Sequence, residues 1–177
     1  MSIEIEILNG DTSWELAHPL FKAIWPPEVV AQLPWAGIAF AHADLRVLVQ
    51  DETGDVVCHV GLYRRMISWN GQKMHVGGIG GVLTRADVRN RGYATVALNA
   101  AIQTFRAEST VNFAMLFCAP DRAPFYMARG FTPFDGSVYV EQPGQGRVRF
   151  DAIAPYVHDL KRTAPTLGTI DLHGLPW

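Results

Sequence analysis

The chain begins with a strict alternation of apolar and polar residues. Three isoleucines alternate with two glutamates over residues 3–7, and this two-residue period is typical of a β-strand with one buried face. The period then changes, because Trp14, Ala17, Phe21 and Ile24 recur every three or four residues, as on one face of a helix. We therefore expect a half-buried first strand followed by a helix.

Two prolines separate this helix from the next part of the chain. Pro26 and Pro27 end it, since proline lacks the N–H that a helix interior needs. A short helix is expected over residues 28–33. Residues 35–44 (WAGIAFAHAD) show no clear period and are predicted to form a loop.

Strand patterns dominate the middle of the chain. Residues 45–50, 56–69 and 72–84 are rich in β-branched and aromatic residues and are separated by short turn sequences. The second of these turns is Asn70-Gly71, the strongest short signal for a β-hairpin. The three segments predict an antiparallel meander.

Helices and strands are mixed in the second half of the chain. A helical spacing of apolar residues runs from Ala94 to Phe105. Residues 113–118 (FAMLFC) read as a buried strand, residues 124–129 as a short helix that Gly130 ends, and residues 138–140 as further strand. Residues 1–177 are thus predicted to form a single α/β (α+β) domain with a central, mostly antiparallel sheet flanked by helices.

Composition narrows the class of protein. The 177 residues are 49% hydrophobic and carry a net charge of −2, which gives no basic surface for nucleic acid. The first residues have neither the charged region nor the apolar run of a signal peptide, and we expect a cytoplasmic protein without membrane contact. Cys58 and Cys118 lie in apolar runs and are predicted to be buried free thiols. No cluster of residues has metal-ligand spacing.

The segment between the third strand of the meander and the next helix has the features of an anion site. Thr84 ends the strand, and Arg89-x-x-Gly92-x-Ala94 opens the helix. The amides from Asn90 to Ala94 would point into one concavity, where the helix dipole favours a pyrophosphate. An ordinary turn with solvated arginines explains the same residues.

Four glycines crowd the strand before this turn. Glycine normally destabilises a strand, so Gly77, Gly78, Gly80 and Gly81 need a reason. Close approach of a ligand that resembles another backbone is one reason, and a β-bulge is the other.

The sequence resembles the GNAT superfamily of acetyl-coenzyme A-dependent N-acyltransferases. The run from Val82 to Ala94 looks like motif A of this superfamily, and Phe125-Tyr126-x-x-x-Gly130-Phe131 looks like its motif B. The resemblance implies a GNAT fold with a twisted sheet and acetyl-CoA as cosubstrate, without a metal. It assigns these residues to acetyl-CoA binding: Val82, Leu83, Thr84, Arg89, Asn90, Arg91, Gly92, Tyr93 and Ala94.

The resemblance also assigns Tyr126 as the general acid that protonates the departing thiolate. A phenol with a pKa near 10 and a thiol near 8.5 are weak acids of similar strength. A core aromatic residue is the alternative role for Tyr126.

Within the superfamily, the sequence looks most like aminoglycoside 2′-N-acetyltransferases. The resemblance lies in VVCHVGLYRRM, RADVRNRG, RAPFYMARGFTPFDG and a tail that ends in Trp177. In that group the tail folds back, so that the terminal tryptophan and its carboxylate help to line the sugar site. The residues this assigns to the substrate side are Gly80, Gly81, Glu141, Asp171 and Trp177.

Two departures from that group bear on the substrate. The acidic residue of the motif A strand is Gly80 here, which leaves the general base unassigned. The acid-rich insertion after motif B is also missing, and only Glu141 remains nearby. Because polycations favour carboxylate-lined sites, a less cationic aminoglycoside is expected. Kasugamycin, with its 2′-amine and zwitterionic amidine-acid group, is the candidate.

Other functions remain open at this point. The chain can be a GNAT acyltransferase for another amine, including a nodulation-type enzyme, which carries a related strand, or a non-catalytic CoA-binding module. His42 and His59 can each face the substrate as a base or be structural histidines. A homodimer is possible, and the fold does not decide the amine.

Overall fold

A computed structural model describes residues 2–177 of the chain. Its helices are α1 (Trp14–Ile24), α2 (Pro27–Val30), α3 (Tyr93–Ala107) and α4 (Ala123–Met127), with a 3₁₀ turn at Ala86–Val88. Its strands are β1 (Glu4–Asn9), β2 (Leu45–Gln50), β3 (Val56–Trp69), β4 (Gln72–Thr84), β5 (Phe113–Cys118), β6 (Thr132–Pro133), β7 (Ser137–Gln142), β8 (Gly146–Arg149), β9 (Ala154–Asp159) and β10 (Thr169–Asp171).

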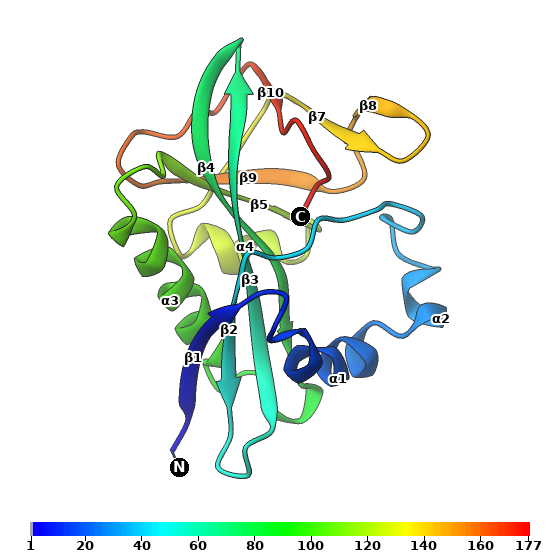
Figure 1. The fold of residues 1–177 in the computed structure, drawn as a ribbon, viewed down its shortest axis with the longest axis vertical. Helices are drawn as coiled ribbons and strands as arrows, with labels where there is room; N and C mark the ends of the chain where they lie inside the picture. The colour runs from blue at the N-terminus through cyan, green and yellow to red at the C-terminus, as the bar shows by residue number, and fades with distance from the viewer. Residues whose placement is uncertain (1) are drawn as a thin grey trace.

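The ten strands form one mixed sheet around which the helices are arranged (Figure 1). Its main path runs β6-β9-β5-β4-β3-β10-β7-β8, and β2 and then β1 extend from β3. Only the β4–β5 and β7–β10 pairs are parallel among the described strands. The predicted α+β architecture with a mostly antiparallel sheet is therefore confirmed.

The central hairpin forms as its turn sequence predicts. β3 and β4 pair in antiparallel register up to Trp69 opposite Gln72. Asn70 and Gly71 both have positive φ, 47° and 81°, as a two-residue type I′ turn requires. Among residues 2–177 this is the longest hairpin, and it carries the site described below.

The two faces of β4 are covered by different parts of the chain. A Cβ added to Gly77 would lie 2.7 Å from the ring of Phe105 in α3, whereas one added to Gly78 would lie 2.4 Å from the indole of Trp177. Since successive residues of a strand face opposite sides, α3 covers one face and the C-terminal residues cover the other. Figure 1 shows the C-terminal end, in red, running into the middle of the molecule.

The first strand differs from its prediction. β1 forms, but Ile3, Ile5 and Ile7 are 37–43% exposed. β1 is an edge strand that pairs only with β2 among the described strands, and the predicted buried face is left uncovered. The predicted helix 28–33 is also shorter, ending at Val30. Within residues 2–177, no helix is long and apolar enough to cross a membrane.

Candidate active site

The centre of the site is the point where β4 separates from β5. The two strands pair in parallel only from Val76 to Ile79 on β4, although β4 continues to Thr84. Two β4 residues, Gly81 and Val82, lie opposite the single residue Val60 of β3, which is a β-bulge. Gly81 has a φ of 56°, a conformation that glycine adopts most readily. Beyond Ile79, the edge of β4 that faces β5 is therefore left without a strand partner.

A buried histidine fixes the bulge. His59 on β3 is fully buried, and its Nδ1 lies 2.6 Å from the carbonyl oxygen of Gly81. Its Nε2 lies 3.0 Å from Nη1 of Arg46. A guanidinium can only donate, so Nε2 accepts and the ring proton is on Nδ1, which donates to Gly81. His59 is thus a structural residue at the site.

Burial, and to a smaller extent the neighbouring Arg46, lowers the pKa of His59 to about 4 against the opposing effect of the Gly81 carbonyl. An unfolded histidine has a pKa of about 6.5 and binds a proton in a range where the folded residue does not. We therefore expect the free energy of unfolding to decrease as the pH falls from about 6.5 to about 4. Urea titrations at several pH values measure this slope.

His59→Asn is the control for that slope. Asparagine does not titrate, so the variant should lose the decrease between pH 6.5 and 4, even if it is less stable at every pH. Asp51 and Asp87 titrate below this window, because hydrogen bonds from Thr53 and Arg85, respectively, lower their pKa values from 3.8. Equal slopes for the two proteins would contradict a neutral, buried His59.

The turn after β4 is built to expose backbone amides. Asn90 and Gly92 both adopt positive φ, 63° and 85°, and Gly92 caps α3 without a side-chain hydrogen bond. Within residues 2–177, no amide from residues 89–95 donates a hydrogen bond to another protein group. These free amides and the positive end of the α3 dipole make a site for an anion.

Arginines surround this turn. Arg89 and Arg91 are exposed, and Nε of Arg89 donates to the carbonyl of Thr84. Arg129 lies two residues beyond the end of α4, packs over the ring of Phe125 in that helix and donates to Oγ1 of Thr95 at 2.7 Å. The guanidinium of Arg129 thereby fixes α4 against the first turn of α3. No local pattern predicts this contact, because Thr95 and Arg129 are far apart in the chain.

Tyr126 lies on α4, just beyond the end of β5. Its side chain is nearly buried against Phe125 and Phe131. Burial raises the pKa of its phenol well above 10, and the nearby Cys118 raises it further. Cys58 and Cys118 are both buried and free, as predicted. The phenol therefore keeps its proton throughout the neutral and mildly alkaline range, and it is a weaker acid than the predicted match with a thiol assumes.

The C-terminal residues are docked, with Trp177 only 4% exposed. The indole Nε1 donates to the carbonyl of Met115 at 3.0 Å, and the ring stacks on Tyr63. The guanidinium of Arg65 lies 5.1 Å from the indole ring. A Cβ on Gly80 would lie 2.9 Å from the main-chain carbonyl carbon of Trp177.

The crowded glycines of β4 are therefore explained by packing within the protein. The missing side chain at Gly77 leaves room for Phe105, and the missing side chains at Gly78 and Gly80 leave room for Trp177. Gly81 forms the predicted bulge. The alternative reason, close approach of a ligand, is not needed for the first three.

Two predicted substrate residues, Asp171 and Glu141, do not line the cavity described below. Asp171 is nearly buried, and its Oδ2 accepts a hydrogen bond from Nε of Arg147 at 2.5 Å. Its Oδ1 accepts from the amide of His173. Glu141 lies three residues after Val138 on β7, so the two side chains face opposite sides of the sheet. Roles in substrate binding for Asp171 and Glu141 stay predictions that these positions do not support.

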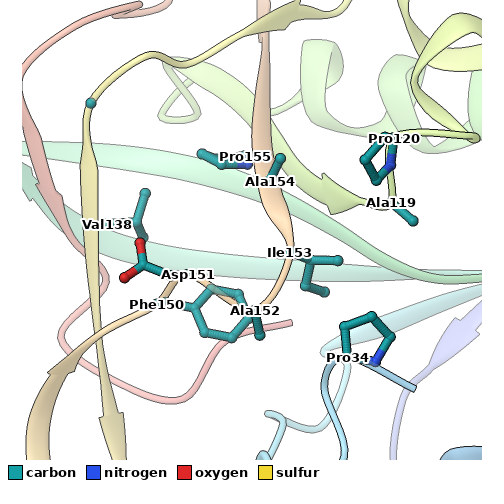
Figure 2. A pocket seen from close by; sticks show the side chains of 11 residues that line it. Pro34, Ala119, Pro120, Val138, Phe150, Asp151, Ala152, Ile153, Ala154 and Pro155 are labelled. Carbon is teal, nitrogen blue, oxygen red and sulfur yellow. The ribbon is translucent and has the colours of Figure 1, made fainter. Parts of the chain in front are cut away.

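A cavity of about 390 Å³ opens beyond the end of β5, beside β7 and the start of β9 (Figure 2). It is lined by Pro34, Ala119, Pro120, Gly136, Val138, Phe150, Asp151, Ala152, Ile153, Ala154 and Pro155. Ala119 and Pro120 directly follow β5, at the end of the strand near Tyr126. Phe150 contacts Phe117, which in turn packs against Trp177. The lining is mostly apolar, and its one charged residue is Asp151.

The comparisons with known proteins agree with this geometry. The sequence profile described as "Acetyltransferase (GNAT) domain" matches residues 21–134. The chain belongs to the GNAT acetyltransferase family. Among curated proteins, no significant match to the sequence was found.

Several solved structures share the fold. YhbS of Escherichia coli, solved in complex with CoA, is 18% identical, with 97% of this chain and 89% of that chain covered and a TM-score of 0.58. An acetyltransferase from Brucella melitensis, in complex with acetyl-CoA, is 13% identical over 97% and 96%, with a TM-score of 0.60. ElaA of E. coli is 13% identical over 89% and 100%, with a TM-score of 0.62. Sequence identities this low establish a shared fold and nothing more.

In this GNAT protein, the anion turn directly follows the strand that carries the bulge, and two of the residues predicted for the substrate, Gly80 and Trp177, lie against each other. The described cavity contains none of Gly80, Gly81, Glu141, Asp171 and Trp177. Within residues 2–177, no group of three His, Cys, Asp or Glu residues is arranged to hold a metal ion. The buried Arg46 was missed, although a lone arginine in the apolar strand LRVLVQ is a signal for a buried polar contact.

Proposed function

We propose that this protein is an acetyl-CoA-dependent N-acetyltransferase that transfers the acetyl group directly to an amine. The observation that carries the proposal is the row of free amides from residues 89–95, next to a β4 edge that β5 leaves unpaired. The amides suit the pyrophosphate of acetyl-CoA. The free edge suits its pantetheine arm, whose amides pair with a strand as another strand would.

The polarity of β4 sets the direction of the arm. The pyrophosphate is held beyond Thr84, so the arm runs back along β4 past Val82 and its acetyl end reaches the bulge at Gly81. The residues proposed to contact acetyl-CoA are Val82, Leu83, Thr84, Arg89, Asn90, Arg91, Gly92, Tyr93 and Ala94. Leu83 contributes its backbone only, because its side chain is buried.

Tyr126 is the proposed general acid. The amine nitrogen bonds to the acetyl carbonyl carbon, the carbon–sulfur bond breaks, and the leaving thiolate takes the phenol proton of Tyr126. The attacking nitrogen, positively charged once it has bonded to the carbonyl carbon, loses its extra proton to solvent to give the neutral amide, and solvent also reprotonates Tyr126. Holding the neutral amine against the thioester supplies much of the rate gain.

For the amine, we propose the 2′-amino group of an aminoglycoside, with kasugamycin as the candidate and antibiotic resistance as the consequence. The cavity of about 390 Å³ has the size of a site for a small molecule. Its single carboxylate, Asp151, favours an acceptor with few positive charges. The docked Trp177 is connected to this cavity through Phe117 and Phe150. Other small amines are the alternative.

A thiol-release assay tests the proposed reaction. Acetyl-CoA is offered with kasugamycin, deoxystreptamine aminoglycosides, polyamines and peptides, and free CoA thiol is measured over time. We expect the highest kcat/KM for kasugamycin. Turnover confined to polyamines or peptides would overturn the aminoglycoside proposal, and no turnover with any amine would favour a CoA-binding module.

Acetyl-CoA should raise the melting temperature of the protein, because a ligand that binds only the folded state stabilises it by mass action. Gly92→Val should abolish this shift, since valine does not readily adopt a φ of 85°. Gly54→Val is the matched control: Gly54 has a φ of 86° and the same open space around its Cβ position, but it lies in the β2–β3 turn. Loss of the shift in both variants would mean that general destabilisation, not the anion turn, is measured.

A further inference from the structure

The bulge of β4 is held by two buried polar side chains that no part of the proposed reaction uses directly. His59 and Arg46 are 0% and 5% exposed. Burying such groups is costly unless every polar atom is paired, and here both ring nitrogens of His59 are occupied. Nε of Arg46 also donates to the carbonyl of Gly10 at 2.9 Å. The arrangement connects the loop before α1 to the bulge through His59.

The contacts around Gly81 leave little freedom to the peptide that follows it. A Cβ on Gly81 would lie 3.1 Å from Cε1 of His59 and 3.2 Å from Cζ of Phe21. Phe21 packs edge-on against the imidazole at 4.8 Å between ring centroids. The Gly81 carbonyl is thus held against an imidazole that neighbours on both sides keep in one orientation.

The direction of the Gly81 carbonyl determines the direction of the next amide. In a planar trans peptide the C=O and the following N–H point in opposite directions. Because the Gly81 carbonyl points at His59 on β3, the N–H of Val82 points away from β3. β5 is the neighbour of β4 on that other side, and it does not pair with β4 beyond Ile79.

We propose that His59, fixed in one tautomer by Arg46, is a positioning residue that aims the Val82 N–H at the thioester carbonyl of bound acetyl-CoA. This inference rests on the proposed function and adds residues to it. Negative charge develops on the carbonyl oxygen as the amine attacks, and a fixed donor at that position stabilises it. His59 acts through the backbone and does not touch the reacting atoms.

Two variants of His59 separate the two hydrogen bonds. In His59→Asn the side-chain amide can take the place of Nδ1 and donate to Gly81, while the acceptor for Arg46 is lost. In His59→Gln the longer side chain can take the place of Nε2 and meet Arg46, while the donor to Gly81 is lost. Each variant loses one hydrogen bond at the same buried position, so each serves as the stability control for the other.

We expect His59→Gln to lower kcat roughly ten- to hundredfold, somewhat less than complete removal of an oxyanion donor. The KM for the amine should stay within about threefold, because the amine does not contact the bulge. His59→Asn should keep kcat within about threefold of the wild type. Equal losses of kcat in the two variants, or none in His59→Gln, would overturn the positioning role.

A spectroscopic experiment tests the positioning without relying on turnover. In ¹⁵N NMR spectra of the wild type, His59 should be neutral with its proton on Nδ1, and added acetyl-CoA should shift the Val82 amide. His59→Gln should reduce that shift, whereas His59→Asn should retain it. A Val82 amide that does not respond in the wild type overturns this inference even if the enzyme acetylates amines. An enzyme with the expected Val82 shift but no turnover instead contradicts the proposed function alone.

Discussion

Tyr126→Phe should lower kcat by roughly 10²–10⁴-fold, the range that one general acid contributes. The ring remains, so packing against Phe125 and Phe131 and the affinity for acetyl-CoA should change little. Only the proton donated to the leaving thiolate is lost. Steady-state kinetics with the best amine measure the effect on kcat, and the acetyl-CoA melting shift measures binding.

The control for this prediction is Tyr139→Phe. Tyr139 also loses one hydroxyl, but it lies on the face of β7 opposite Val138 and packs under Arg147. The kcat of the Tyr139→Phe variant should equal that of the wild type. If Tyr126→Phe retains turnover within a factor of three, Tyr126 is a packing residue, and water protonates the thiolate.

The raised pKa of Tyr126 adds a pH dependence to this prediction. Burial keeps the phenol protonated well above pH 10, so loss of the acid should not lower kcat of the wild type between pH 7 and 9. A kcat that falls with an apparent pKa near 8 would point to a different donor. Cys118 near this tyrosine is not that donor, because burial raises the pKa of its thiol to about 11.

Elements whose cause is local could be predicted from the sequence. The β3–β4 hairpin follows from Asn70-Gly71, which favours the positive φ that both residues adopt. The anion turn follows from Gly92 and the helical spacing after it. In both cases the deciding residues are adjacent in the chain.

Features that depend on distant residues could not be predicted in the same way. Gly77 and Gly78 have no local explanation, because Phe105 and Trp177 fill the space beside them. Asp171 reads as a free carboxylate in the sequence, but the fold pairs it with Arg147. The prediction that one face of β1 is buried was wrong for the same reason, since nothing in the sequence of β1 tells whether another element covers it.

The tail should contribute a large part of the stability of the protein. Trp177→Ala is expected to lower the free energy of unfolding by about 3–5 kcal/mol, the usual cost of truncating a buried tryptophan. The indole is 4% exposed and hydrogen-bonded to Met115, so both packing and a hydrogen bond are lost. Leu167→Ala in the same tail is the control and should cost under about 0.5 kcal/mol, because Leu167 is 64% exposed. Urea unfolding followed by fluorescence of the remaining tryptophans measures both.

A double-mutant cycle then tests why β4 carries a glycine at position 78. Gly78→Ala alone should destabilise the protein, because its Cβ would lie 2.4 Å from Cε2 of Trp177 and the indole would have to move. In the Trp177→Ala background the same substitution meets no indole, and alanine is preferred to glycine within a strand interior. We therefore expect Gly78→Ala to be neutral or stabilising there, with a coupling free energy of about 1–3 kcal/mol between the two positions. Additive effects would mean that Gly78 is required for another reason, such as contact with a bound ligand.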